Sequence, residues 1–203
     1  MRREAVFDSS FWVHAVYLGI VDFVLADYIL LCPRAVAKEL GRENLTSQRL
    51  KEYVSAKTIA LVTPKTMKIA LYGDGERAAI NLALERHYVL LIDDWRPYEA
   101  ARAAGVEVVN ILAYLVQLYK QQRISLDRIL ADFTRLTRRG TLKPEWLQAA
   151  LTLVGELRKK DKDALGMTSR RATARGGETP GRNPQGNPAA RSRQAALFFL
   201  LQS

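Results

Sequence analysis

Short apolar runs alternate with helical patterns over the first half of the chain, and this alternation constrains the fold more than any other feature. Each run is bounded by polar or turn residues, as is typical of strands buried in a parallel sheet. The predicted strands are residues 5–7, 28–32, 59–62, 88–92 and 106–109. Because strand and helix follow one another throughout, the sequence predicts an α/β fold: a three-layer α/β/α sandwich with a central parallel sheet.

Capping residues mark where several of the predicted helices begin. Ser9 and Ser10 can cap the first helix, Pro33 and Pro97 suit a first helical turn, and Asn110 can cap a later helix. The last two patterns predict a C-terminal helical pair. The predicted helices cover residues 12–17, 33–40, 42–57, 76–86, 97–104, 110–122, 126–138 and 144–157.

The helical pattern stops after Lys160. Residues 176–188 contain four glycines and three prolines, and the surrounding stretch is polar. Such a composition buries too little apolar surface to offset the entropy of ordering the chain. We therefore expect one folded domain, residues 1–157, followed by a disordered basic tail, residues 158–203.

Composition places the chain among soluble globular proteins, with 48% hydrophobic and 26% charged residues. Residues 156–203 contain ten Lys/Arg and four Asp/Glu and so supply +6 of the formal charge of +10. The basic balance is therefore only weak evidence that the folded part binds nucleic acid. The single cysteine, Cys32, cannot form an intrachain disulfide, and no run approaches the ~20 apolar residues that span a bilayer. We expect a cytoplasmic protein without a membrane partner.

Four carboxylates follow predicted strands or lie on helices near strand ends, at Asp8, Glu39, Glu76 and Asp94. The carboxyl ends of parallel strands meet at one edge, where α/β proteins bind their ligands. Converging carboxylates repel one another unless cations neutralise them, and oxygen ligands with water suit Mg²⁺ or Mn²⁺. The alternative is that these acids are turns and helix caps, since carboxylates are common at helix N-termini.

Several other chemistries lack their sequence motifs. The chain has no P-loop, no glycine-rich dinucleotide motif after a strand and no serine-hydrolase elbow. Zinc is not expected, because His14 and His87 are the only histidines and have no ligand spacing. A divalent ion held by carboxylates at a cleft is suited to phosphodiester chemistry.

Four segments together resemble the PIN-domain nucleases, in particular the bacterial and archaeal branch similar to VapC-type toxins of toxin–antitoxin pairs. They are an apolar strand with Asp-x-Ser, a proline-led helix ending in Glu-Leu, a Gly-Glu helix start, and an apolar strand with Asp-Asp. These segments are residues 6–10, 32–40, 75–83 and 90–94, the last followed by residues 100–105. The resemblance covers residues 4–157. It implies a parallel-sheet α/β/α domain whose acids bind Mg²⁺ or Mn²⁺ and cleave RNA.

By position, the resemblance assigns the four acidic places to Asp8, Glu39, Glu76 and Asp94. Many family members have Asp where this chain has Glu76, so this longer side chain is expected to act through water or not at all. We expect Asp94 rather than Asp93 to bind metal, because adjacent strand residues point to opposite faces. Ser10 is expected to hydrogen-bond an acid or the scissile phosphate.

The resemblance predicts a metal-dependent endoribonuclease, the toxin half of a toxin–antitoxin pair. The expected partners are RNA, an antitoxin protein and a second copy of the chain in a homodimer. One alternative is a PIN fold with weak catalysis that binds RNA or protein. Another is a structural protein in which the four acids are only caps and turns.

Overall fold

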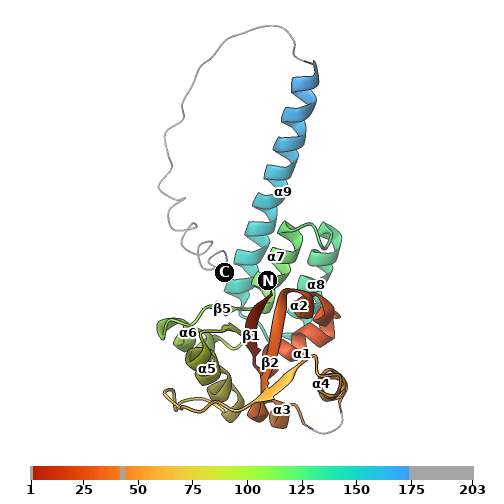
Figure 1. Cartoon of the computed structure of the whole chain (residues 1–203). Helices are drawn as coiled ribbons and strands as arrows, with labels where there is room; N and C mark the ends of the chain where they lie inside the picture. The colour runs from red at the N-terminus through yellow and green to blue at the C-terminus, as the bar shows by residue number, and fades with distance from the viewer. Residues whose placement is uncertain (1, 42–43, 174–203) are drawn as a thin grey trace.

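A five-stranded parallel sheet forms the centre of the molecule (Figure 1). The computed structural model describes residues 2–41 and 44–173. The strands lie in the order β3-β2-β1-β4-β5 and all pair in parallel. They are β1 (Arg3–Phe7), β2 (Tyr28–Pro33), β3 (Ala60–Val62), β4 (Val89–Leu91) and β5 (Val108–Val109). The predicted α/β fold with a central parallel sheet is confirmed.

The register of the sheet brings the ends of β1 and β4 together. Phe7 of β1 pairs with Leu91 of β4, and the Asp8 amide donates a hydrogen bond to the Leu91 carbonyl at 3.0 Å. The residues that follow the two strands therefore meet at the carboxyl edge of the sheet, where α/β folds place their ligands.

Helices flank the sheet on both sides. α5 packs against β1, β2 and β4 and contacts α3 and α6, whereas α7 packs against α1, α8 and α9. The helices are α1 (Ser9–Leu18), α2 (Val21–Asp27), α3 (Arg34–Glu39), α4 (Leu45–Ser55), α5 (Asp74–Arg86), α6 (Trp95–Ala103), α7 (Ile111–Lys120), α8 (Leu126–Arg139) and α9 (Pro144–Thr173).

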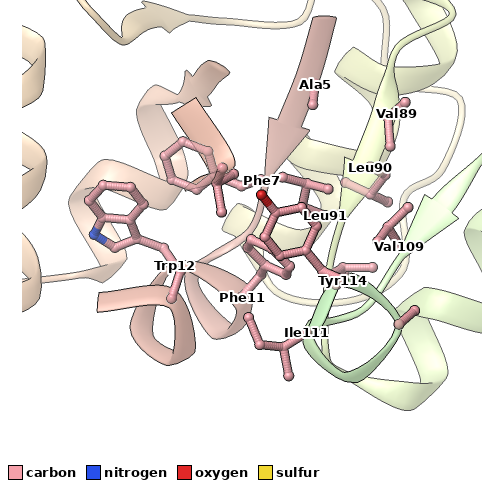
Figure 2. Packing of buried hydrophobic residues seen from close by; sticks show 14 of the residues in the cluster. Ala5, Phe7, Phe11, Trp12, Val89, Leu90, Leu91, Val109, Ile111 and Tyr114 are labelled. Atoms are coloured by element: carbon pink, nitrogen blue, oxygen red, sulfur yellow. The ribbon is translucent and has the colours of Figure 1, made fainter. Parts of the chain in front are cut away.

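Aromatic side chains fill the core between the sheet and the helices α1 and α7 (Figure 2). The Phe7 ring stacks on Trp12 of α1 with 5.0 Å between centroids, and Phe11 meets Tyr114 of α7 edge-on at 6.3 Å. All four side chains are at most 2% exposed. Since α1 begins directly after β1, this packing fixes the direction in which the chain leaves the sheet at Asp8.

One helix was not predicted, and several helix boundaries differ from the sequence prediction. Residues 21–27 form α2, which was not predicted because its N-cap, Ile20, offers no side-chain hydrogen bond. α6 begins at Trp95, two residues before Pro97; proline is tolerated there because the first-turn amides have no partner within the helix. α4 begins at Leu45, where Asn44 forms a capping box with Ser47.

The last helix is longer than predicted. α9 runs from Pro144 to Thr173, whereas the sequence pattern predicted an end at residue 157. Residues 158–173 lack proline and are rich in Lys, Arg and Ala, which favour helix without needing an apolar stripe. The rest of the predicted tail, residues 174–203, lies outside the described residues.

Within the described residues, no single helix is long and apolar enough to cross a membrane; α1 and α2 reach that length and composition only as a pair, bent by 118°.

Candidate functional site

A cavity of about 370 Å³ opens at the carboxyl edge of the sheet, and we call it the acidic cleft. Its walls come from α1, the end of α3, the start of α4, the connection from β4 to α6, and the connection from α8 to α9. The polar lining residues are Ser9, Ser10, His14, Glu39, Asn44, Thr46, Asp93, Asp94, Arg139 and Thr141.

Asp8 lies beneath this cleft, fully buried where β1 ends and α1 begins. Its Oδ1 accepts the Phe11 amide at 3.0 Å, which caps α1, and both of its oxygens accept the Ser10 hydroxyl at 2.8–2.9 Å. Burial raises the pKa of Asp8 well above its usual range, and the nearby Asp93 and Asp94 raise it further against these hydrogen bonds. The site therefore disfavours the ionised carboxylate unless positive charge is supplied.

Asp94 lies at the cleft surface, at the N-cap position of α6, where its side chain makes no capping hydrogen bond. Partial desolvation raises the pKa of Asp94; Asp93 also raises it, whereas Ser10 and His14 oppose the shift. An exposed carboxylate that does not cap its own helix is available to a ligand in the cleft.

Asp93 is buried and engaged with the protein. The His14 Nδ1 donates to Asp93 Oδ2 at 2.6 Å, and the Ile111 amide donates to Oδ1 at 2.7 Å. The Asp93 amide in turn donates to the Ser10 hydroxyl at 3.1 Å. β4 ends at Leu91, so the alternation of strand side chains does not extend to this pair, and Asp93 lines the same cavity as Asp94. The expectation that Asp93 turns to the opposite face is therefore not met.

Glu39 is the exposed last residue of α3 and reaches across to the start of α5. Its Oε1 accepts the Gly75 amide at 2.6 Å, and the Ser9 hydroxyl lies 3.4 Å from Oε2. A Cβ on residue 75 would lie only 2.0 Å from that Oε2. Because Gly75 has no side chain, the Glu39 carboxylate can lie against the first turn of α5.

Glu76 is used by its own helix. Its Oε2 accepts the Gly73 amide at 2.9 Å, as the N-terminal cap of α5, and the residue does not line the acidic cleft. An ideal Cβ on Gly73 would lie 3.3 Å from Glu76 Oε2 and 3.7 Å from Glu39 Oε1, so both carboxylates flank this glycine. Glu76 therefore lies at the margin of the site, beside Glu39.

The sequence prediction missed several cleft residues, of which His14 is the most buried. His14 joins the Asp93 carboxylate to the Thr141 hydroxyl, which lies 2.8 Å from its Nε2. Arg139 lines the cleft beside Thr141. The sequence signal was weak: His14 lies at no metal-ligand spacing, and its partners are 79 and 127 residues away.

The donor set fits a magnesium or manganese ion in its chemistry. Mg²⁺ is usually held by one or two carboxylates and several waters. Asp8 and Asp94 are such oxygen donors, and burial, with a further contribution from Asp93, raises the pKa of both carboxyl groups. In the described part of the chain, no three or more His, Cys, Asp or Glu side chains are grouped closely enough to hold an ion by themselves. Two carboxylates, Asp94 in the cleft wall and Asp8 buried beneath it, together with water would therefore have to supply the ligands.

The parallel α/β sheet, with carboxylates after two of its strands, is a fold that binds ligands at its carboxyl edge. A family model described as a PIN domain matches residues 6–156. The chain belongs to the PIN-domain family, whose members are generally nucleases that use divalent metals.

The chain was also compared with curated proteins and with solved structures. Among curated proteins, none matches the chain significantly. A solved structure described as a domain of a functionally unknown protein from Methanocaldococcus jannaschii DSM 2661 is 21% identical, with a TM-score of 0.39. The similarity covers 54% of this chain and 91% of that one.

Proposed function

We propose that the protein is a metal-dependent endoribonuclease that hydrolyses RNA phosphodiester bonds in the acidic cleft. The observation that carries this proposal is the buried Asp8 carboxylate beneath the cleft, with its raised pKa beside Asp93 and Asp94. Burying a carboxylate near two others is costly unless a cation binds. A cleft with several carboxylates at its base is suited to bind a divalent ion and a phosphodiester.

In this proposal Asp8 and Asp94 hold one Mg²⁺ or Mn²⁺. When bound, the ion lowers the pKa of a coordinated water and neutralises charge on the phosphodiester. Ser10 keeps the Asp8 carboxylate in place through its hydrogen bonds to both oxygens. The RNA bond is hydrolysed when water adds to phosphorus, one P–O bond breaks and the leaving oxygen gains a proton.

Glu39 is the third acid that we assign to the reaction. Its Oε1 is fixed by the Gly75 amide, while Oε2 lies on the cleft side near Ser9. An oriented carboxylate at this position can accept a proton from the attacking water. Arg139, across the cleft, can contact a phosphate of the RNA.

We further propose that this nuclease is the toxin component of a toxin–antitoxin pair, similar to VapC-type toxins, and acts in the cytoplasm as a homodimer held inactive by an antitoxin protein. The support is the resemblance of the four acidic segments to that branch of the family. Expression of the wild-type chain should arrest growth, and co-expression of the neighbouring gene product should relieve this arrest. Expression of Asp94→Asn should not arrest growth even without the neighbouring gene product.

A second candidate function is an RNA- or protein-binding PIN domain with weak catalysis. One acid favours it, because Glu76 caps its own helix. Glu76 is therefore less available to a metal than the family pattern requires.

Cleavage of a mixed RNA pool separates the two candidates. Wild-type protein should cleave RNA with Mn²⁺ and stop in EDTA, and Asp94→Asn should be inactive. Asp127→Asn is a matched control, since Asp127 is also exposed at a helix N-terminus but lies at the far end of α8 from the cleft. Equal activity in all three proteins, or RNA binding without any cleavage, would refute the nuclease proposal.

A further inference from the structure

An exposed tryptophan adjoins the acidic cleft directly. Trp95 follows Asp94 in the chain and is the first residue of α6. It is 37% exposed, in contrast to Trp12, which is 2% exposed in the core. An indole left partly open to solvent beside a cleft for phosphodiesters is a surface on which a nucleic-acid base can stack.

Neighbouring aromatic residues hold Trp95 in place. Tyr98 lies nearly parallel to it with 6.3 Å between ring centroids, and Trp146 of α9 meets it at 5.2 Å in an edge-on arrangement. Tyr98 is buried and itself contacts Trp146 at 4.9 Å. The three rings join α6 to α9, so the open indole is part of a packed cluster and needs little ordering before it binds a base.

Positive charge lies over the face of the same ring. The Lys143 ammonium is 3.7 Å from the centroid of the Trp95 ring. Across the connection between α8 and α9, Arg139 lines the acidic cleft, and its guanidinium is 4.7 Å from the Tyr17 ring. A cation next to a stacking ring matches a nucleotide, in which a phosphate adjoins each base.

The segment that bears these cations is tied to the floor of the cleft. Thr141, between Arg139 and Lys143, is hydrogen-bonded to His14, which is hydrogen-bonded to Asp93. These contacts run from Asp93, the neighbour of Asp94, through His14 to Thr141 in the connection between α8 and α9. Arg139 and Lys143 are therefore placed relative to the acids by buried groups and not only by their own loop.

We propose that Trp95 and Lys143 form a base-stacking subsite that receives an unpaired base of the RNA next to the scissile phosphate. The proposal deepens the function proposed above and rests on it. A base that stacks on Trp95 displaces the flexible Lys143 side chain from the ring face. The Lys143 ammonium then meets the phosphate of that nucleotide, while Arg139 holds the backbone at the opposite side of the cleft. A paired base cannot stack there without leaving its helix, so the subsite selects single-stranded segments.

Binding measured without cleavage tests the subsite. Fluorescence anisotropy would follow short labelled oligomers in EDTA: a single-stranded RNA, the same RNA as a duplex, and an abasic ribose-phosphate strand of equal length. Trp95→Ala should weaken binding of the single strand about tenfold, the usual order for one lost base stack. Trp95→Phe should recover most of this loss, because a phenyl ring also stacks.

The abasic strand separates stacking from support of the fold. Trp95→Ala should leave its affinity unchanged, whereas Lys143→Gln should weaken the abasic and normal strands alike. Tyr88→Ala is the matched control, because Tyr88 precedes β4 at the opposite edge of the sheet and should not alter binding. Equal losses on both strands for Trp95→Ala, or no loss on the RNA, would overturn the proposal.

The subsite and the nuclease function can fail separately. RNA cleavage that depends on Asp94, together with unchanged binding by Trp95→Ala, would remove the subsite and leave the nuclease. A base-dependent loss with Trp95→Ala in a protein that never cleaves RNA would support the subsite and remove the nuclease.

Discussion

The Glu39 carboxylate and Gly75 fit together so closely that a side chain at position 75 is excluded. The Gly75 amide donates to Glu39 Oε1 at 2.6 Å, and an added Cβ would lie 2.0 Å from Oε2. The contact joins the end of α3 to the first turn of α5, where the helix dipole favours a negative charge. Glu39 is thereby held at the cleft by the backbone of a neighbouring helix.

Gly75→Ala should displace Glu39 without unfolding the protein. The atoms in conflict are the far end of a flexible side chain, and alanine is itself favourable in a helix. Single-turnover RNA cleavage should fall roughly 10–100-fold, as is usual when a supporting contact is lost. The same loss is expected for Glu39→Gln, with no further loss in the double variant.

Gly155→Ala in α9 is the control, because a Cβ there meets nothing within 4 Å. If Gly75→Ala and Gly155→Ala cleave RNA at the same rate, the position of the Glu39 carboxylate does not matter to the reaction.

Asp8→Asn should stabilise the protein at neutral pH in EDTA. Burial raises the pKa of Asp8 in the folded state, so the folded chain binds this proton more tightly than the unfolded chain. The protonated Asp8 therefore stabilises the folded state. This stabilisation is fully present below the pKa of Asp in the unfolded chain, about 4, and is lost as pH rises through the pKa of Asp8 in the folded chain. Asparagine does not titrate, so the Tm difference from wild type should be smallest near pH 4 and grow toward pH 7.

Thermal melting across this pH range measures the effect. For a chain of this size, about 1 kcal/mol of relieved cost raises Tm by roughly 2–4 °C. Asp127→Asn, at an exposed site away from the cleft, is the control variant. An Asp8→Asn protein that melts below wild type at pH 7 in EDTA would contradict the strained-carboxylate account.

Asp94 and Glu76 should differ sharply in their effect on cleavage. Asp94→Asn should reduce single-turnover cleavage by several orders of magnitude, since it removes a proposed metal-binding oxygen. From sequence alone, Glu76→Gln is expected to cost about 10–100-fold. The cap geometry lowers this to less than about tenfold, because the glutamine carbonyl can still accept the Gly73 amide. Equal loss in both variants would mean that Glu76 acts at the metal.

Asp93→Asn should act through stability. The sequence predicted that Asp94 rather than Asp93 binds metal, and in the structure Asp93 is buried and hydrogen-bonded to both His14 and Ile111. Weakening a buried hydrogen-bonded partner costs about 1–3 kcal/mol. Chemical denaturation should show this loss, with a smaller one for Thr141→Val, which removes one hydroxyl at the exposed end of the same contacts. An Asp93→Asn protein as stable as wild type would show that His14 does not depend on the carboxylate.

The parts of the fold and site that the sequence predicts are those fixed by local pattern. The strand–helix alternation predicts the parallel sheet, and the position of Asp8 and Asp94 directly after strands predicts the edge that they share. The contacts of His14 could not be predicted, because Asp93 and Thr141 meet it from 79 and 127 residues away. The close approach of Glu39 to Gly75 is likewise a tertiary contact, visible in sequence only as a glycine before Glu76. The proposed subsite at Trp95 depends on Lys143, which precedes α9, and on Trp146 of α9, both far from Trp95 in the sequence.

Calorimetric titration of Mn²⁺ tests the central claim most directly, namely that Asp8 and Asp94 hold a divalent ion at the carboxyl edge of the sheet. Wild-type protein and Asp127→Asn should each bind one Mn²⁺ ion. Binding should raise their free energy of unfolding by RT ln(1 + [L]/Kd), about 2.7 kcal/mol at a hundredfold excess over Kd, and so raise their Tm. Asp8→Asn and Asp94→Asn, shown to be folded by circular dichroism, should lose this binding and its stabilisation. Equal Mn²⁺ binding by all four proteins would contradict the account.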